Sequence, residues 1–174
     1  MQVRSLLAGS FSTALSLLGG VAAADAPIPP ALAVPEDLQL LLRVRAKGLQ
    51  IYVCAPGKDD TGHAAWSLKG PEATLFNEAG KVIGRHFVGP SWALNDGSLV
   101  TGEVTAKDPG PNAGAVPWLL LTVASNGGRG ILQGARAIQR IDTEGGVAPA
   151  GNCDVGQEYR APYSAIYQFF GAKP

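Results

Sequence analysis

Apolar and polar residues alternate along much of the chain from position 38 onward, and this pattern predicts β-strands. Aliphatic side chains recur at every second position over residues 38–45, and the same period returns over residues 49–54. A period of two places successive side chains on opposite faces of a strand. We expect a turn or bulge at Lys47-Gly48 between these two strands. Residues 163–170 alternate in the same way and predict a final strand that seals the sheet.

Turn residues divide the middle of the chain into further short strands. Residues 73–76 and 81–87 flank Asn77-Glu78-Ala79-Gly80, which predicts a β-hairpin with glycine at its turn. Asn95-Asp96-Gly97 predicts a second turn. Residues 98–106 predict the strand that follows it.

Three other segments do not show a simple alternation of apolar and polar residues. Residues 118–124 (WLLLTVA) form the most apolar run and predict a strand central to the core. Residues 131–141 carry isoleucine and alanine at helical spacing, but they fit an irregular strand equally well. Pro90 cannot donate a hydrogen bond within a ladder, so we expect residues 88–92 to leave the sheet and Trp92 to lie on a loop.

The number of short strands and the turn content set the expected fold class. The chain of 174 residues contains 23 glycines and 13 prolines, which suit many strands joined by turns better than a helical bundle. We therefore predict an all-β protein, a single-domain β-sandwich or closed barrel of about seven to nine strands with long loops.

The N-terminal region has the form of a secretory signal peptide. One positive charge precedes an apolar run over residues 5–21, and Ala22-Ala23-Ala24 offers a small-residue cleavage site. A transmembrane anchor is the alternative, but the run is short for that role. We expect a signal peptide over residues 1–24, a Pro-rich extended lead-in over 25–37 and one β domain over 38–174. The mature protein is then secreted or periplasmic, with no membrane span after the leader is cleaved.

Charge and cysteine content narrow the class of partner. The formal net charge is zero, which argues against nucleic acid because a nucleic-acid partner requires a clustered basic face.

Two cysteines in an exported chain, Cys54 and Cys153, predict one disulfide, with two free thiols as the alternative. We expect no metal site, since tetrahedral protein sites usually need four ligands.

No cofactor is expected either. The glycines after the apolar run at 118–124 imitate a dinucleotide-binding loop, but their spacing is Gly-x-Gly-x-x-x-Gly and no βαβ unit follows. A connecting loop that needs positive φ is the simpler interpretation. Catalytic residues stay unknown, because no Gly-x-Ser-x-Gly elbow or paired carboxylates stand out.

Four residues are candidates for a ligand pocket: His86, Trp92, Asp96 and Arg140. An aromatic ring beside polar groups can stack on a flat or apolar ligand. His86 is also interpreted as a structural histidine at a strand end. Arg140 lies between Ile138 and Ile141, and such a charged residue either faces water or pairs with a carboxylate. Trp92 either stacks on a ligand or plugs the end of the fold.

Six segments follow one another along the chain: GLQIYVC (48–54), PEATLF (71–76), GRHFVGPSW (84–92), PWLL (117–120), IQRIDT (138–143) and PYSAIY (162–167). As an ordered set they resemble an exported bacterial and fungal family known as domain-of-unknown-function family thirty-four fifty-five. The resemblance covers nearly all of the mature chain and implies secretion, one domain and a disulfide matching Cys54 and Cys153. It implies no established activity and no catalytic residues.

The leading functional hypothesis is a non-enzymatic exported protein that binds a small ligand or a cell-surface component. Two alternatives stay open: an exported hydrolase that uses His86 with a nearby serine or aspartate, and a structural or stress-related envelope protein.

Overall fold

The computed structural model describes residues 26–57 and 63–174, and it confirms the all-β prediction. The predicted signal peptide lies outside the described residues. Two short 3-10 turns, η1 (Pro30–Leu32) and η2 (Ile131–Gly134), are the helical elements of the described part. None of its helices is long and apolar enough to cross a membrane. The strands are β1 (Leu38–Pro56), β2 (Ala64–Phe76), β3 (Val82–Phe87), β4 (Ser91–Leu94), β5 (Leu99–Asp108), β6 (Trp118–Gly127), β7 (Ala135–Gly145) and β8 (Glu158–Ala172).

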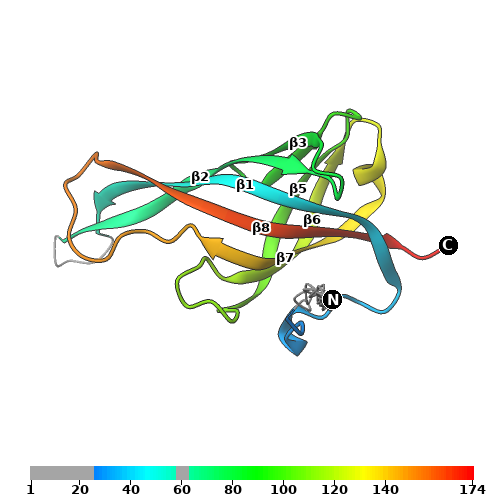
Figure 1. Ribbon diagram of the computed structural model, residues 1–174, viewed down its shortest axis with the longest axis horizontal. Helices are drawn as coiled ribbons and strands as arrows, with labels where there is room; N and C mark the ends of the chain where they lie inside the picture. The colour runs from blue at the N-terminus through cyan, green and yellow to red at the C-terminus, as the bar shows by residue number, and fades with distance from the viewer. Residues whose placement is uncertain (1–25, 58–62) are drawn as a thin grey trace, which may run out of the picture.

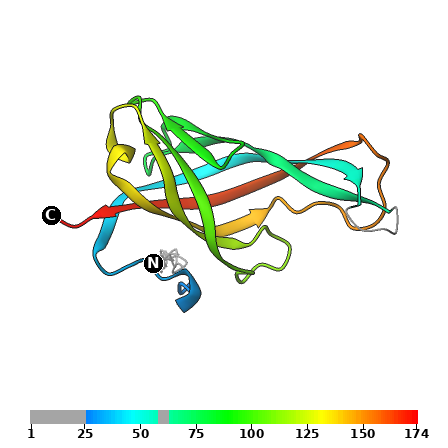
Figure 2. The ribbon, with the colours of Figure 1, turned by 180° about the vertical axis from the view of Figure 1, so that it is seen from behind.

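These eight strands form one closed antiparallel barrel, the second of the two architectures predicted (Figures 1 and 2). Each strand pairs with the next along the chain, and β8 returns to pair with β1 through partners such as Val44 and Tyr167. Closure gives every barrel strand a paired neighbour on each side.

The expected turn at Lys47-Gly48 is wrong, because β1 runs through it as a single strand of 19 residues. Gly48 pairs with Ala73 on one side and Tyr163 on the other, so the ladder continues. A Cβ on Gly48 would collide with the Glu72 carbonyl oxygen and with Ala73. The glycine therefore lets β2 approach closely where the strand curves, which a sequence pattern reads as a break.

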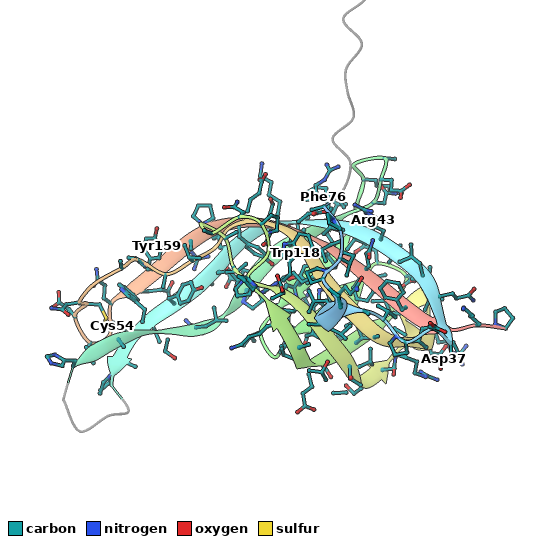
Figure 3. All side chains as sticks on the ribbon, turned by 90° about the horizontal axis from the view of Figure 1, so that it is seen from below. Asp37, Arg43, Cys54, Phe76, Trp118 and Tyr159 are labelled. Carbon is teal, nitrogen blue, oxygen red and sulfur yellow. A yellow bond between two sulfur atoms is a disulfide. The ribbon has the colours of Figure 1, made fainter. Side chains whose placement is uncertain are left out.

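Three strands continue beyond the barrel as an arm, defined by residues 51–56 of β1, 64–70 of β2 and 158–161 of β8. In this stretch β1 pairs with both neighbours, while β2 has not yet met β3 and β8 is no longer paired with β7. The arm extends to the left of the barrel in Figure 1, and Figure 3 shows Cys54 and Tyr159 on it, away from Trp118. Cys54 and Cys153 form the predicted disulfide near its tip.

The main core fills most of the barrel interior. Alternate residues of β8 point inward, as the pattern over residues 163–170 predicts, and η2 covers this end with the fully buried Leu132. The fully or nearly buried members are Val44, Ala46, Ala73, Leu75, Trp92, Val100, Val116, Leu121, Leu132, Ala135, Ile138, Tyr163, Ala165, Tyr167 and Phe169.

A second, smaller core lies on the outside of the barrel, under the segment that precedes β1. Leu32 of η1 packs with Trp118 and Ile141. The Gln139 side-chain amide donates to the Leu32 carbonyl oxygen over 2.6 Å. The lead-in is therefore not extended throughout, because Pro30–Leu32 form η1, which packs against β6 and β7.

Two local expectations are settled by pairing between strands. Trp92 is not on a loop: it lies in β4, which pairs with β3 and β5, and only 1% of it is exposed. Pro90 lies in the turn between β3 and β4, so its missing N–H removes no hydrogen bond from the ladder of either strand. The ambiguous segment over residues 131–141 is a 3-10 turn, η2, followed by strand β7.

Candidate functional site: a cavity inside the barrel

The barrel interior contains a cavity of about 240 Å³ at the end where the arm begins. Residues from all eight strands line it, so it is the unfilled part of the lumen. Its polar side chains include Gln50 from β1, His86 from β3, Arg140 from β7 and Tyr167 from β8. Leu119, Leu121 and Trp92 are among its apolar lining residues.

Three of the four candidate residues from the sequence line this one cavity: His86, Trp92 and Arg140. His86 and Trp92 are cross-strand partners on β3 and β4, so the hairpin brings them together. Arg140 enters from β7, where it is paired with Tyr167 of β8. The tertiary fold therefore joins residues that are about fifty positions apart along the chain.

Asp96 does not line the cavity. Its carboxylate accepts hydrogen bonds from the Ser98 backbone N–H and hydroxyl and from the Ile131 N–H, at 2.6–2.9 Å. The Ser98 hydroxyl is the main reason that the pKa of this carboxyl lies below its usual value. Asp96 thus ties the turn after β4 to η2, at the closed end of the barrel.

His86 is buried and neutral. Its Nδ1 donates to the Ser91 carbonyl oxygen over 2.9 Å, so the proton is on Nδ1 and Nε2 is left as an acceptor. Burial lowers the pKa of His86 to about 3, with the Arg140 charge adding to the effect and the Ser91 hydrogen bond opposing it. The ring also contacts Tyr167, with centroids 5.0 Å apart.

Ser91 and Asp96 do not form a relay with this histidine. The Ser91 hydroxyl donates to the Gly89 carbonyl oxygen, and only the backbone of Ser91 meets His86. A catalytic histidine is oriented by a carboxylate and bonded to its nucleophile. At His86 the Ser91 backbone carbonyl oxygen stands where a carboxylate would orient the ring, and the Ser91 hydroxyl is bonded to Gly89 instead of to the ring.

Three residues that line the cavity each carry a polar atom that is buried without a hydrogen-bond partner. These atoms are the Gln50 Nε2, the Trp92 Nε1 and the Tyr167 hydroxyl. Each of these residues is about 1% exposed. The Tyr167 hydroxyl lies near Arg140 and the Tyr163 hydroxyl but completes no hydrogen bond of standard geometry with either. Burying such a donor unpaired costs about 1–3 kcal/mol, so a ligand or water that accepts from it is favoured.

The cavity opens to solvent between β2, β5 and the turn that joins β3 to β4. Leu68, Val88 and Val104 line this mouth and are 54%, 60% and 47% exposed. Lys69 lies beside them, and its ammonium pairs with Glu158 over 3.1 Å. Apolar side chains thus continue from the cavity wall onto the outer surface.

The residues that the structure describes contain no group of three or more His, Cys, Asp or Glu side chains placed to hold a metal ion. The glycines after β6 belong to the connection from β6 to η2, and Gly128 and Gly130 have φ of 68° and 146°. The interpretation of this stretch as a connecting loop with positive φ is confirmed.

Among the lining residues that sequence reasoning missed are Gln50 and Tyr167. Tyr167 shares the inward face of β8 with Tyr163 and Phe169, so the alternation predicted its burial but not the cavity beside it. Gln50 offers no signal of its own, because a glutamine on a strand normally faces solvent. Its position follows from the place where β1 leaves the barrel.

Comparison with known proteins identifies a family and no closer relative. No curated protein and no solved structure matches the chain. A family model described as "Protein of unknown function (DUF3455)" matches residues 35–171, which include every strand of the barrel and both cysteines. The chain therefore belongs to the DUF3455 family, as the six ordered segments predict.

Proposed function

We propose that this is an exported, non-enzymatic protein that binds a small, largely apolar ligand inside its barrel. The observation that carries the proposal is the set of three buried donors, on Gln50, Trp92 and Tyr167, that lack protein partners and belong to the wall of one cavity. Eight-stranded barrels are wide enough either to be filled by side chains or to hold one small ligand. A wall that is mostly apolar with a few convergent polar groups is typical of ligand sites.

The size of the cavity limits the ligand. About 240 Å³ is slightly below the usual range of about 300–1,000 Å³ for small-molecule sites. The apolar mouth at Leu68, Val88 and Val104 allows part of a ligand to extend outside. A molecule of roughly ten non-hydrogen atoms is therefore a suitable first probe.

Binding is favoured over hydrolysis by the state of His86. The Nδ1–H of its neutral imidazole is bound to a backbone carbonyl, and among the described residues no carboxylate orients the ring and no serine hydroxyl is bonded to it. The disulfide supports export, since structural disulfides persist in oxidising compartments.

The proposal is tested with Trp92 as the only fluorescent indole. In a Trp66→Phe/Trp118→Phe variant, titration with octan-1-ol should change the emission of Trp92 saturably and raise the melting temperature. The matched control is Trp92→Phe, which retains Trp66 on the arm and Trp118 in the outer core. Octanol should leave the emission of that variant unchanged. Absence of both the saturable change and the thermal shift in the first variant would refute binding in the lumen.

A further inference from the structure

We infer that the ligand of this cavity carries a single carboxylate, which Arg140 binds, and that its apolar body points toward the mouth at Leu68 and Val88. This inference rests on the proposed function and adds the chemical class of the ligand. The ligand is thus a small amphiphilic acid. Three features of Arg140 carry it: its charge, the donors that it has left over, and the groups around it.

Arg140 brings an uncompensated positive charge to the lumen. Within the described part of the chain, no aspartate or glutamate lines the cavity and Arg140 makes no ion pair. The other cation at the cavity, Lys69, is already paired with Glu158 at the surface. A partly buried charge without a partner is costly, so an anion that enters the cavity is stabilised at Arg140 more than elsewhere.

The free donors of Arg140 fit a carboxylate. The Nε and Nη2 atoms both donate to the Pro117 carbonyl oxygen, at 3.0 and 2.7 Å. A guanidinium has five N–H donors. The Pro117 contact uses the N–H of Nε and one N–H of Nη2, so the second N–H of Nη2 and both N–H groups of Nη1 are left. Two parallel N–H groups match the two oxygens of a carboxylate. The Pro117 contact also fixes the guanidinium, which lowers the entropy lost on binding.

The groups around Arg140 are all neutral near pH 7. Tyr52, His86, Tyr163 and Tyr167 each feel its charge. Burial raises the pKa of the three tyrosine hydroxyls, with the Arg140 charge opposing it, and burial keeps His86 unprotonated. An incoming carboxylate therefore meets no negative charge, and the Tyr167 hydroxyl offers it an additional unpaired donor.

The barrel topology orients the ligand. Strand β7, which carries Arg140, is four strands away from β3 in the closed order of eight, so it lies on the opposite wall. Leu68 of β2 and Val88 after β3 are on the side of the mouth. An acid bound at Arg140 can therefore extend its apolar part across the lumen to the mouth.

Three probes with the same alkyl chain test this inference: octanoate, octan-1-ol and octylammonium. Calorimetric titration at pH 7 should show octanoate binding about tenfold or more tightly than octanol, since hydrogen bonds to charged groups are stronger than neutral ones. Octylammonium should bind more weakly than octanol. In Arg140→Gln, the ratio of octanoate affinity to octanol affinity should fall to about one, because the charged donors that distinguish the two probes are gone.

Two further variants serve as comparisons. Arg136→Gln removes an exposed arginine from the same strand, outside the cavity, and should keep the full preference. Arg140→Lys keeps the charge without the planar pair of donors and should retain only part of the preference for octanoate. If wild type binds octanol but octanoate no more tightly, or if the preference survives in Arg140→Gln, the acid assignment is wrong and lumen binding stands. If no probe binds, both proposals fail.

Discussion

The imidazole of His86 lies flat against the indole of Trp92, with ring centroids 4.4 Å apart and planes 9° from parallel. Tyr167 and Phe169 of β8 meet the Trp92 ring edge-on, at 5.2 and 5.9 Å. This aromatic cluster joins β3 and β4 to β8 across the lumen. It also buries the imidazole so completely that its neutral form is strongly favoured.

We predict that acid destabilises this protein through His86. The pKa of His86 is about 3 in the folded state, against an ordinary value of 6.5, so between these values the unfolded chain holds a proton that the folded chain does not. The free energy of unfolding therefore falls as pH drops below about 6.5. From pH 6.5 to 4.5 the loss from this group is roughly 2–3 kcal/mol. Urea denaturation at several pH values measures it.

The variant His86→Phe keeps an aromatic ring beside Trp92 and should remove this part of the pH dependence. Its stability at pH 7 is expected to be lower, because the Ser91 carbonyl oxygen loses its donor, so the slope with pH is the diagnostic quantity. His63→Gln, which replaces an exposed histidine, should keep the wild-type slope. Equal slopes in wild type and His86→Phe would contradict the assignment.

The segment before β1 should contribute to stability through the outer core. Leu32 is fully buried, and its replacement by alanine should lower the free energy of unfolding by about 2–5 kcal/mol, the usual range for such cavities. Ile28→Ala, in the same segment but 38% exposed, should cost much less. Chemical denaturation of both variants checks this. A similar small effect for the two would mean that η1 is not part of the cooperative unit.

The disulfide should stabilise the chain by restricting the unfolded state. Cys54 and Cys153 are 99 residues apart in the sequence, and closing a loop of that length is worth on the order of 4–5 kcal/mol in the chain-entropy model. The double variant Cys54→Ala/Cys153→Ala should unfold at a clearly lower urea concentration. Mass mapping without reductant should recover the two cysteine peptides linked. An unchanged denaturation midpoint after reduction and alkylation would show that the constraint contributes little.

Within single strands, the sequence was a reliable guide. Tyr163, Tyr167 and Phe169 alternate with polar or half-buried residues, and all three face the core. The hairpin formed by β2 and β3 and the turn at Asn95-Asp96-Gly97 also follow from residue types alone, because turn geometry depends on a few adjacent residues. Cysteine count and the form of the N-terminus were enough to predict the disulfide.

Errors arose where neighbouring strands decide the outcome. Gly48 resembles a turn residue, yet β2 and β8 pair with it on both sides and carry β1 through. Trp92 follows a Gly-Pro-Ser sequence typical of loops, yet pairing with β3 and β5 makes its segment a strand. Strand pairing is non-local, so no window of sequence around either residue contains the deciding partner.

Residue types along the chain were enough to predict the all-β class, the strand alternation and the cysteine pair. Strand pairing in three dimensions was needed to know that the sheet closes into a barrel, that Asp96 lies outside the cavity, and that Gln50 and Tyr167 line one cavity with Arg140. Alternation specifies which face of each strand is buried. The lumen left between those faces depends on how eight strands are paired, curved and closed on one another.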